Sequence, residues 1–98
     1  MSTVGTPLRV LIAEDSPDDV LLLLREIRRG GYDPDYIAVD SAAQFDQALA
    51  DGEWQVILAD YAMPAFTGLD ALRRVRDRGL DTPFILISGT IGEELAVE

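Results

Sequence analysis

The chain has 98 residues and a formal net charge of −10, and it contains neither cysteine nor histidine. All eight basic residues are arginine, so lysine is absent as well. These absences exclude Cys or His metal sites, disulfides, Ser-His and Cys-His nucleophile pairs, Schiff-base lysines and P-loop lysines. The acidic charge also argues against binding to nucleic acid or anionic membranes, which requires clustered positive charge.

Length and hydropathy predict a single domain over residues 1–98. The first seven residues are short and polar and do not resemble a signal peptide. The longest uninterrupted apolar runs, 20–24 and 84–87, are far shorter than the ~20 residues of a membrane span. We therefore expect a cytoplasmic domain without membrane contact.

Strand-like and helical segments alternate along the chain. Residues 8–13 are rich in branched side chains and predict a strand. Ser16 and Pro17 then predict the start of a helix, which the glycines at 30–31 end. The rest of the pattern predicts strands at 36–39, 56–59 and 84–88, helices after Ser41 and from Thr67 or Gly68 to Gly79, and the start of a fourth helix over 93–98.

This alternation predicts an α/β fold in which helices cover both faces of a parallel sheet. Right-handed crossovers favour a doubly wound, flavodoxin-like sheet with strand order 2-1-3-4. In that order the apolar strand 84–88 is an open edge, and such edges tend to pair with other chains. We therefore expect dimerisation or exchange through this strand and the fourth helix.

Polar residues follow the strands at one edge of the predicted sheet. Glu14 and Asp15 follow the first strand, Asp60 follows the third, and Ser88 ends the fourth. The carboxyl ends of neighbouring parallel strands meet at a shared crevice, so the three acids are expected to lie together. Crowded carboxylates require a proton or a cation, and an open site of oxygen ligands suits magnesium.

The loop after Asp60 has a defined composition. Pro64 stiffens it, and Gly68 permits either a positive φ or a close approach of the backbone. This loop would hold Asp60 on a fixed backbone.

Together these motifs resemble the response regulator receiver domain from about residue 8 onward. The resemblance rests on the acidic pair Glu14-Asp15, on Asp60 followed by Met63-Pro64 and Gly68, and on Ser88 after the fourth strand. The three motifs occur in the order that this family has, on the expected elements.

The resemblance implies a role for each site residue. Asp60 would accept a phosphoryl group from a histidine kinase or phosphotransfer protein, and Ser88 with Gly89 would bind its oxygens. Asp15, Glu14, Asp60 and the carbonyl of Ala62 would bind magnesium, and Ala62 would also contact the phosphoryl group. The domain would act as a signalling phosphoacceptor rather than as an enzyme.

The chain departs from the family pattern in one respect. The family has a fifth strand that ends in a lysine paired with the phosphoryl group, then a fifth helix, and this sequence carries neither. A receiver truncated after the start of its fourth helix, acting only as a protein-interaction module, is therefore the alternative. Two other protein classes are disfavoured. A phosphatase of the haloacid dehalogenase type needs a second Asp at the position that Ala62 occupies. A flavin-binding protein of this fold would bind the flavin phosphate after the first strand, where the acids at 14–19 would repel it.

Overall fold

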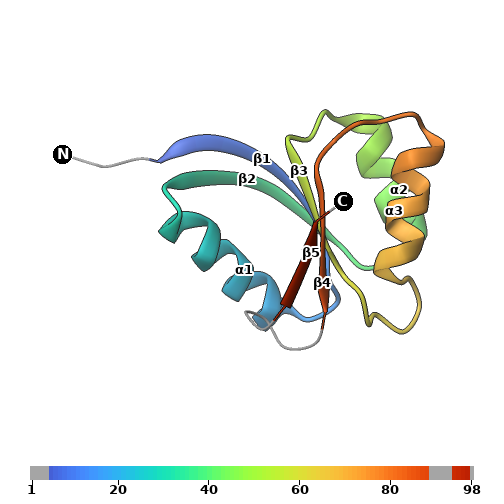
Figure 1. The fold of residues 1–98 in the computed structure, drawn as a ribbon, viewed down its shortest axis with the longest axis horizontal. Coiled ribbons are helices and arrows are strands. Elements are labelled where there is room, and N and C mark those ends of the chain that lie inside the picture. The colour runs from blue at the N-terminus through green and yellow to red at the C-terminus, as the bar shows by residue number, and fades with distance from the viewer. Residues whose placement is uncertain (1–4, 89–93, 98) are drawn as a thin grey trace.

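The computed structural model describes residues 5–88 and 94–97 of the chain (Figure 1). Eight elements follow one another, and strands and helices alternate through the first seven. In chain order they are β1 (Thr6–Ala13), α1 (Pro17–Arg29), β2 (Tyr32–Val39), α2 (Ala42–Asp51), β3 (Val56–Asp60), α3 (Gly68–Asp77), β4 (Phe84–Ser88) and β5 (Glu94–Val97). Within these described ranges no helix is long and apolar enough to cross a membrane.

Each helix begins with a hydroxyl side chain that accepts a hydrogen bond from a backbone N–H of the first turn. Ser16 Oγ accepts from Asp19 at 3.3 Å, and the corresponding caps of α2 and α3 are Ser41 and Thr67. Because the first N–H groups of a helix lack partners within it, these caps fix where the helices start. The sequence-based helix starts are therefore confirmed.

The first four strands are parallel in the order β2-β1-β3-β4, as predicted. Their registers align the carboxyl ends, since Ala13 pairs with both Val39 and Ala59, and Asp60 pairs with Ile87. Strand β2 begins four residues earlier than the sequence predicted, because all eight residues of β1 pair with it. Pro34 lies within this additional stretch, where its missing N–H is tolerated since β2 is an edge strand.

The helix predicted over residues 93–98 is wrong for residues 94–97, and residues 93 and 98 lie outside the described residues. Residues 94–97 form β5, which pairs antiparallel with β4 and matches Ser88 to Glu94 and Ile85 to Val97. This pairing satisfies the backbone groups along the outer side of β4. Strand β4 is therefore not an open edge, and the dimer expected through that edge and a fourth helix loses its structural basis.

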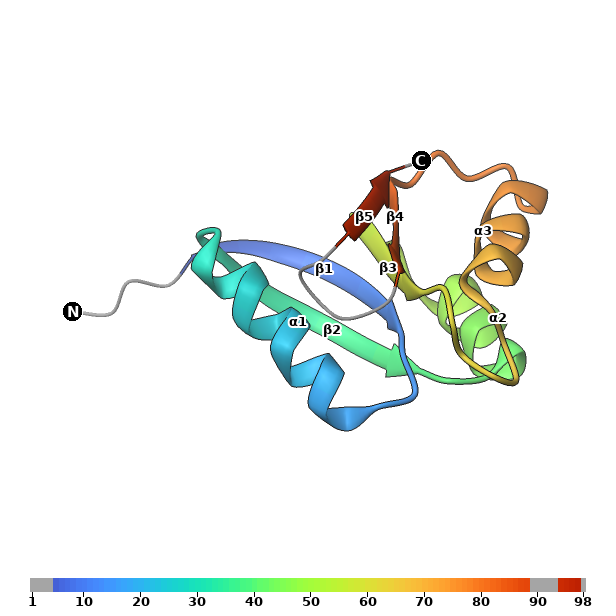
Figure 2. The ribbon, with the colours of Figure 1, turned by 60° about the horizontal axis from the view of Figure 1, so that its bottom comes forward.

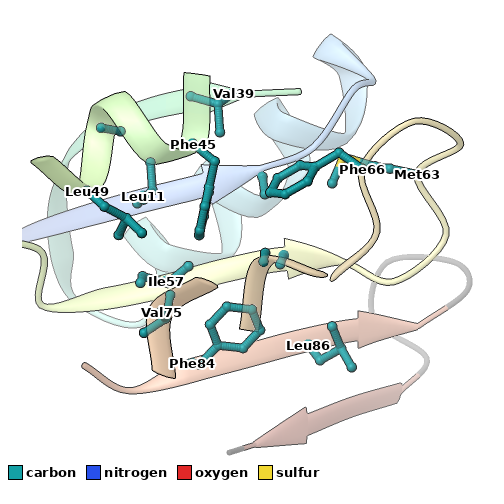
Figure 3. Close-up of a cluster of buried hydrophobic side chains, with 14 residues drawn as sticks. Leu11, Val39, Phe45, Leu49, Ile57, Met63, Phe66, Val75, Phe84 and Leu86 are labelled. Atoms are coloured by element: carbon teal, nitrogen blue, oxygen red, sulfur yellow. The ribbon is translucent and has the colours of Figure 1, made fainter. Parts of the chain in front are cut away.

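The helices divide unequally between the two faces of the sheet (Figures 1 and 2). Helices α2 and α3 cover one face, where Phe45 and Phe66 pack with ring centroids 5.2 Å apart in a cluster with Leu11, Ile57 and Phe84 (Figure 3). Helix α1 covers the other face through a second buried cluster. Beside α1, apolar side chains of β1, β3 and β4 line an open groove of about 480 Å³.

A group of polar and aromatic side chains covers the amino ends of the strands. The Trp54 indole N–H donates to the Ala48 carbonyl at 2.9 Å, and the Arg9 guanidinium lies 4.6 Å from the indole centroid. Arg9 also pairs with Asp35 on β2 at 3.4 Å. This group joins β1, β2 and the end of α2 at the side of the sheet opposite to the predicted site.

Candidate functional site

Three carboxylates meet at the carboxyl edge of the sheet. Glu14 and Asp15 directly follow β1, and Asp60 is the last residue of the neighbouring strand β3. Each residue offers one oxygen, and these oxygens all lie within 4.8 Å of one another. The prediction that the three acids share one crevice is confirmed.

Glu14 is the acid most removed from solvent, with 5% of its surface exposed. Its Oε2 accepts a hydrogen bond from the Ser16 N–H at 3.1 Å. Burial raises the pKa of Glu14 from 4.5 to about 7, and the charge of Asp60 adds to the rise, although the Ser16 hydrogen bond opposes it. Without a cation, therefore, the carboxyl group of Glu14 gains and loses its proton near neutral pH.

Asp60 is held by the backbone on both of its sides. Its Oδ1 accepts a hydrogen bond from the Ala62 N–H at 3.0 Å, which fixes the rotation of the carboxylate. The next residue, Tyr61, donates its N–H to the Ile87 carbonyl at 2.8 Å and so continues the pairing of β3 with β4. The carboxylate thus emerges from a rigid strand end.

Gly68 makes the turn from this loop into α3 possible because of its small size. A Cβ at position 68 would overlap Leu86 Cδ1 and lie 2.9 Å from the Asp60 carbonyl oxygen. Of the two roles predicted for this glycine, the structure has the close approach; the glycines with positive φ are Gly31 and Gly79. The first turn of α3 can therefore pack directly against the backbone of Asp60.

The other two residues predicted for the site belong to the end of β4. Ser88 ends this strand, one residue after the Ile87 that pairs with Asp60. Gly89 lies outside the described residues. The backbone of Ser88 is thus at the same edge of the sheet as the three acids.

The residues that anchor the loop on its core side were not predicted from the sequence. Met63 and Phe66 point into the core beneath the loop (Figure 3) and are 3% and 1% exposed. Arg74 covers Phe66 at 6.0 Å from the ring centroid and pairs with Asp46 of α2 at 2.5 Å. The spacing of Phe66 from the apolar positions of α3 was the available signal for its burial, whereas the partner of Arg74 lies 28 residues away.

The model of one known family, the response regulator receiver domain, matches residues 10–98. This match spans most of the chain and includes all the residues of the acidic crevice. The chain belongs to the response regulator receiver domain family. The order of its four parallel strands is the one predicted from the sequence.

Relatives and solved structures agree with this assignment. The receiver domain is 35% identical over 85 residues to the response regulator protein PmrA of Pseudomonas aeruginosa, covering 83% of this chain and 36% of PmrA. It matches the receiver domain of the putative response regulator NarL from Mycobacterium tuberculosis with a TM-score of 0.70 and 28% identity, covering 90% of this chain and 71% of that one. The chain spans about a third or less of the length of the curated relatives it matches.

A third match concerns the crevice of another receiver domain. The receiver domain of the sensor histidine kinase PA1611 from Pseudomonas aeruginosa has a TM-score of 0.68 at 20% identity, covering 90% of this chain and 72% of that one. That protein is described with a magnesium ion coordinated in its active-site cleft.

The donor set in this receiver domain fits a divalent metal ion. Its three side chains offer only oxygen, the donor that magnesium prefers. Burial is the main reason that the pKa of Glu14 is raised, and the charge of Asp60 adds a repulsion between the two carboxylates. A divalent cation would remove this repulsion.

Proposed function

We propose that this receiver domain is a phosphoacceptor of a two-component phosphorelay, with Asp60 as the acceptor and magnesium as its cofactor. The observation that carries the proposal is the meeting of three carboxylate oxygens within 4.8 Å, one of them from an Asp fixed on a rigid strand end. Such a cluster is unstable as three anions, and it is suited to bind a metal that also accepts phosphoryl oxygens.

Glu14, Asp15 and Asp60 would hold the metal with their side chains, and Ala62 with its backbone carbonyl. Bound magnesium supplies charge neutralisation for the carboxylates and for the incoming phosphoryl oxygens. The Ala62 N–H holds Asp60 Oδ1 at 3.0 Å, so the carboxylate is oriented before the donor arrives. Positioning of this kind accounts for most of the catalysis in phosphoryl transfer.

The phosphoryl donor would be the phosphohistidine of a histidine kinase or of a phosphotransfer protein. A carboxylate oxygen of Asp60 attacks phosphorus, the bond between phosphorus and the imidazole nitrogen breaks, and the imidazole leaves. Ser88, Gly89 and Ala62 would bind the transferred group at the ends of β3 and β4. We propose that the domain acts in the cytoplasm as the partner of such a donor.

Phosphorylation by a small phosphodonor tests this function directly. The chain is incubated with acetyl phosphate and magnesium, and intact-protein mass spectrometry is used to detect one added phosphoryl group. We expect a base-labile adduct on the native chain and on Asp81→Asn, an exposed Asp at the amino end of β4, but not on Asp60→Asn. An unmodified native chain, or an adduct that persists in Asp60→Asn, would contradict the proposal.

The second candidate is a receiver that acts only as a protein-interaction module. It is favoured by the exposed apolar side chains of Leu21 and Leu22 on α1, which are available to a protein partner. The same experiment separates the two functions. A chain that binds magnesium but forms no adduct supports the interaction module.

A further inference from the structure

The outward face of α1 carries two exposed leucines between opposite charges. Leu21 is 62% exposed and Leu22 is 42% exposed. Asp18 lies three residues before Leu21, and Arg25 lies three residues after Leu22. Because residues spaced by three, four and seven share one side of a helix, these four side chains form a single stripe. We call it the α1 stripe.

The core does not account for the α1 stripe. The residues that α1 buries against the sheet are Val20, Leu23 and Leu24, which lie on the opposite side of the helix. Leu21 instead lines a surface hollow of about 410 Å³ together with Tyr36 of β2, whose side chain is also exposed. Exposed apolar side chains of α1 and β2 therefore meet at this hollow, whose lining also includes Glu14, Asp15 and Asp40.

The charge of α1 decides which partner fits. Three acids and three arginines give the helix a net charge of zero, whereas the chain as a whole carries −10. The acids Asp18 and Asp19 lie in its first turn and the arginines Arg28 and Arg29 in its last. A second copy therefore meets less repulsion at this neutral helix than the chain's net charge of −10 imposes elsewhere.

We propose that α1 pairs with α1 of a second copy in antiparallel orientation, forming a two-fold symmetric dimer. The α1 stripe is symmetric about the bond between Leu21 and Leu22, since three positions separate each leucine from its neighbouring charge. A two-fold axis at this point brings the four leucines together. It also places Asp18 of each copy against Arg25 of the other, so the interface is isologous and contains two ion pairs.

The charged pair is free to form between copies. Arg25 takes part in none of the ion pairs found among residues 5–88 and 94–97, and Asp18 likewise. The contact area of one helix pair is small, so the dimer belongs to the weak, transient class. The interface would lie next to the acidic crevice, because Leu21 lines the same hollow as Glu14 and Asp15.

Sedimentation velocity of the 98-residue chain tests the dimer. In buffer of physiological ionic strength we expect the weight-average mass to rise toward that of a dimer between about 20 and 500 µM. A chain that remains monomeric over this range overturns the proposal and leaves the α1 stripe to a different protein.

Two charge reversals identify the antiparallel geometry. Asp18→Arg and Arg25→Asp should each weaken self-association by about tenfold, because each creates two like-charge contacts per dimer. An equimolar mixture of the two variants should regain the native association, because both contacts of the mixed dimer are then of opposite charge. A mixture that associates no better than its components overturns the proposed pairing, even if the native chain dimerises.

An exposed leucine elsewhere provides the matched control. Leu69 on α3 is 47% exposed, an exposed fraction similar to the 42% of Leu22, and it lies outside the α1 stripe. We expect Leu22→Gln to abolish self-association over the same concentrations and Leu69→Gln to leave it unchanged, with circular dichroism confirming that both variants fold. Equal effects of the two substitutions would overturn the assignment of the interface to α1.

Discussion

Glu14 and Asp60 stand at the ends of neighbouring strands with carboxylate oxygens within 4.8 Å of each other, and Glu14 is the more deeply buried of the two. Their proximity makes the site responsive to both protons and cations. A proton on Glu14 and a divalent ion between the carboxylates relieve the same repulsion, so each should oppose the binding of the other.

The stability of the metal-free protein should therefore fall as the pH rises. The pKa of Glu14 is raised from 4.5 to about 7 on folding, so the folded state holds this proton more tightly than the unfolded chain. Its stabilising contribution is complete below pH 4.5 and is lost as the pH rises through about 7. In urea titrations the unfolding free energy of the native chain should fall by about 2 kcal/mol, relative to Glu14→Gln, between about pH 5.5 and pH 8.

Magnesium should reverse this dependence. The metal needs an ionised Glu14. Saturating magnesium should therefore make the native chain more stable at about pH 8 than at about pH 5.5. Glu53→Gln, which neutralises an exposed acid before β3, should follow the native chain under both conditions. Parallel curves for the native chain and Glu14→Gln would show that the pKa of Glu14 is ordinary.

Magnesium affinity should depend on Asp60 itself. Asp60→Asn removes one charge and one ligand from the crevice, and we expect it to weaken magnesium binding by about tenfold or more in calorimetric titration. Asp81→Asn has the same change of charge at the opposite edge of the sheet and should bind as the native chain does. Unchanged affinity in Asp60→Asn would mean that the three acids do not act as one site.

Gly68 should tolerate no side chain. Gly68→Ala places a methyl group against Leu86 and 2.9 Å from the Asp60 carbonyl oxygen, so either α3 or the end of β3 must move. We expect a loss of about 1–3 kcal/mol in unfolding free energy and a weaker magnesium affinity. Gly52→Ala is the control, because its added Cβ would meet no atom closer than 3.5 Å.

Arg74 should matter more than the other arginines of α3. Arg74→Met removes the pair with Asp46 and the cover over Phe66, although partial exposure of both charges limits the cost to about 1 kcal/mol. Arg73 is exposed on the same helix, and we expect Arg73→Met to change thermal stability by less than about 0.5 kcal/mol. Equal melting temperatures for the two variants would show that the Asp46 pair contributes nothing.

The parallel core of the fold follows from local patterns. Ser16, Ser41 and Thr67 each cap the helix that follows, and the four segments predicted as strands form β1 to β4. The crevice follows from the same patterns, because the carboxyl ends of β1 and β3 meet once their order is known. These features depend on residues that are neighbours in the sequence, so the sequence alone is enough to predict them.

Features that depend on distant partners could not be predicted. The segment 94–97 has no local preference strong enough to decide its structure, and pairing with β4 makes it a strand. Arg74 has the appearance of a solvated helix residue until α2 places Asp46 beside it. The depth at which Glu14 is buried likewise depends on how α1 packs over β1, which no pattern around position 14 describes.

Trp54 provides this domain with an internal optical reporter. It is the single tryptophan of the chain, and it precedes β3, while Asp60 ends that strand roughly 20 Å further along the extended chain. The indole is fixed by Ala48 and stacked by Arg9, so its fluorescence emission will change when the sheet unfolds. Metal or phosphoryl binding at the far end of β3 will leave that emission nearly constant, which lets one optical signal separate unfolding from ligand binding.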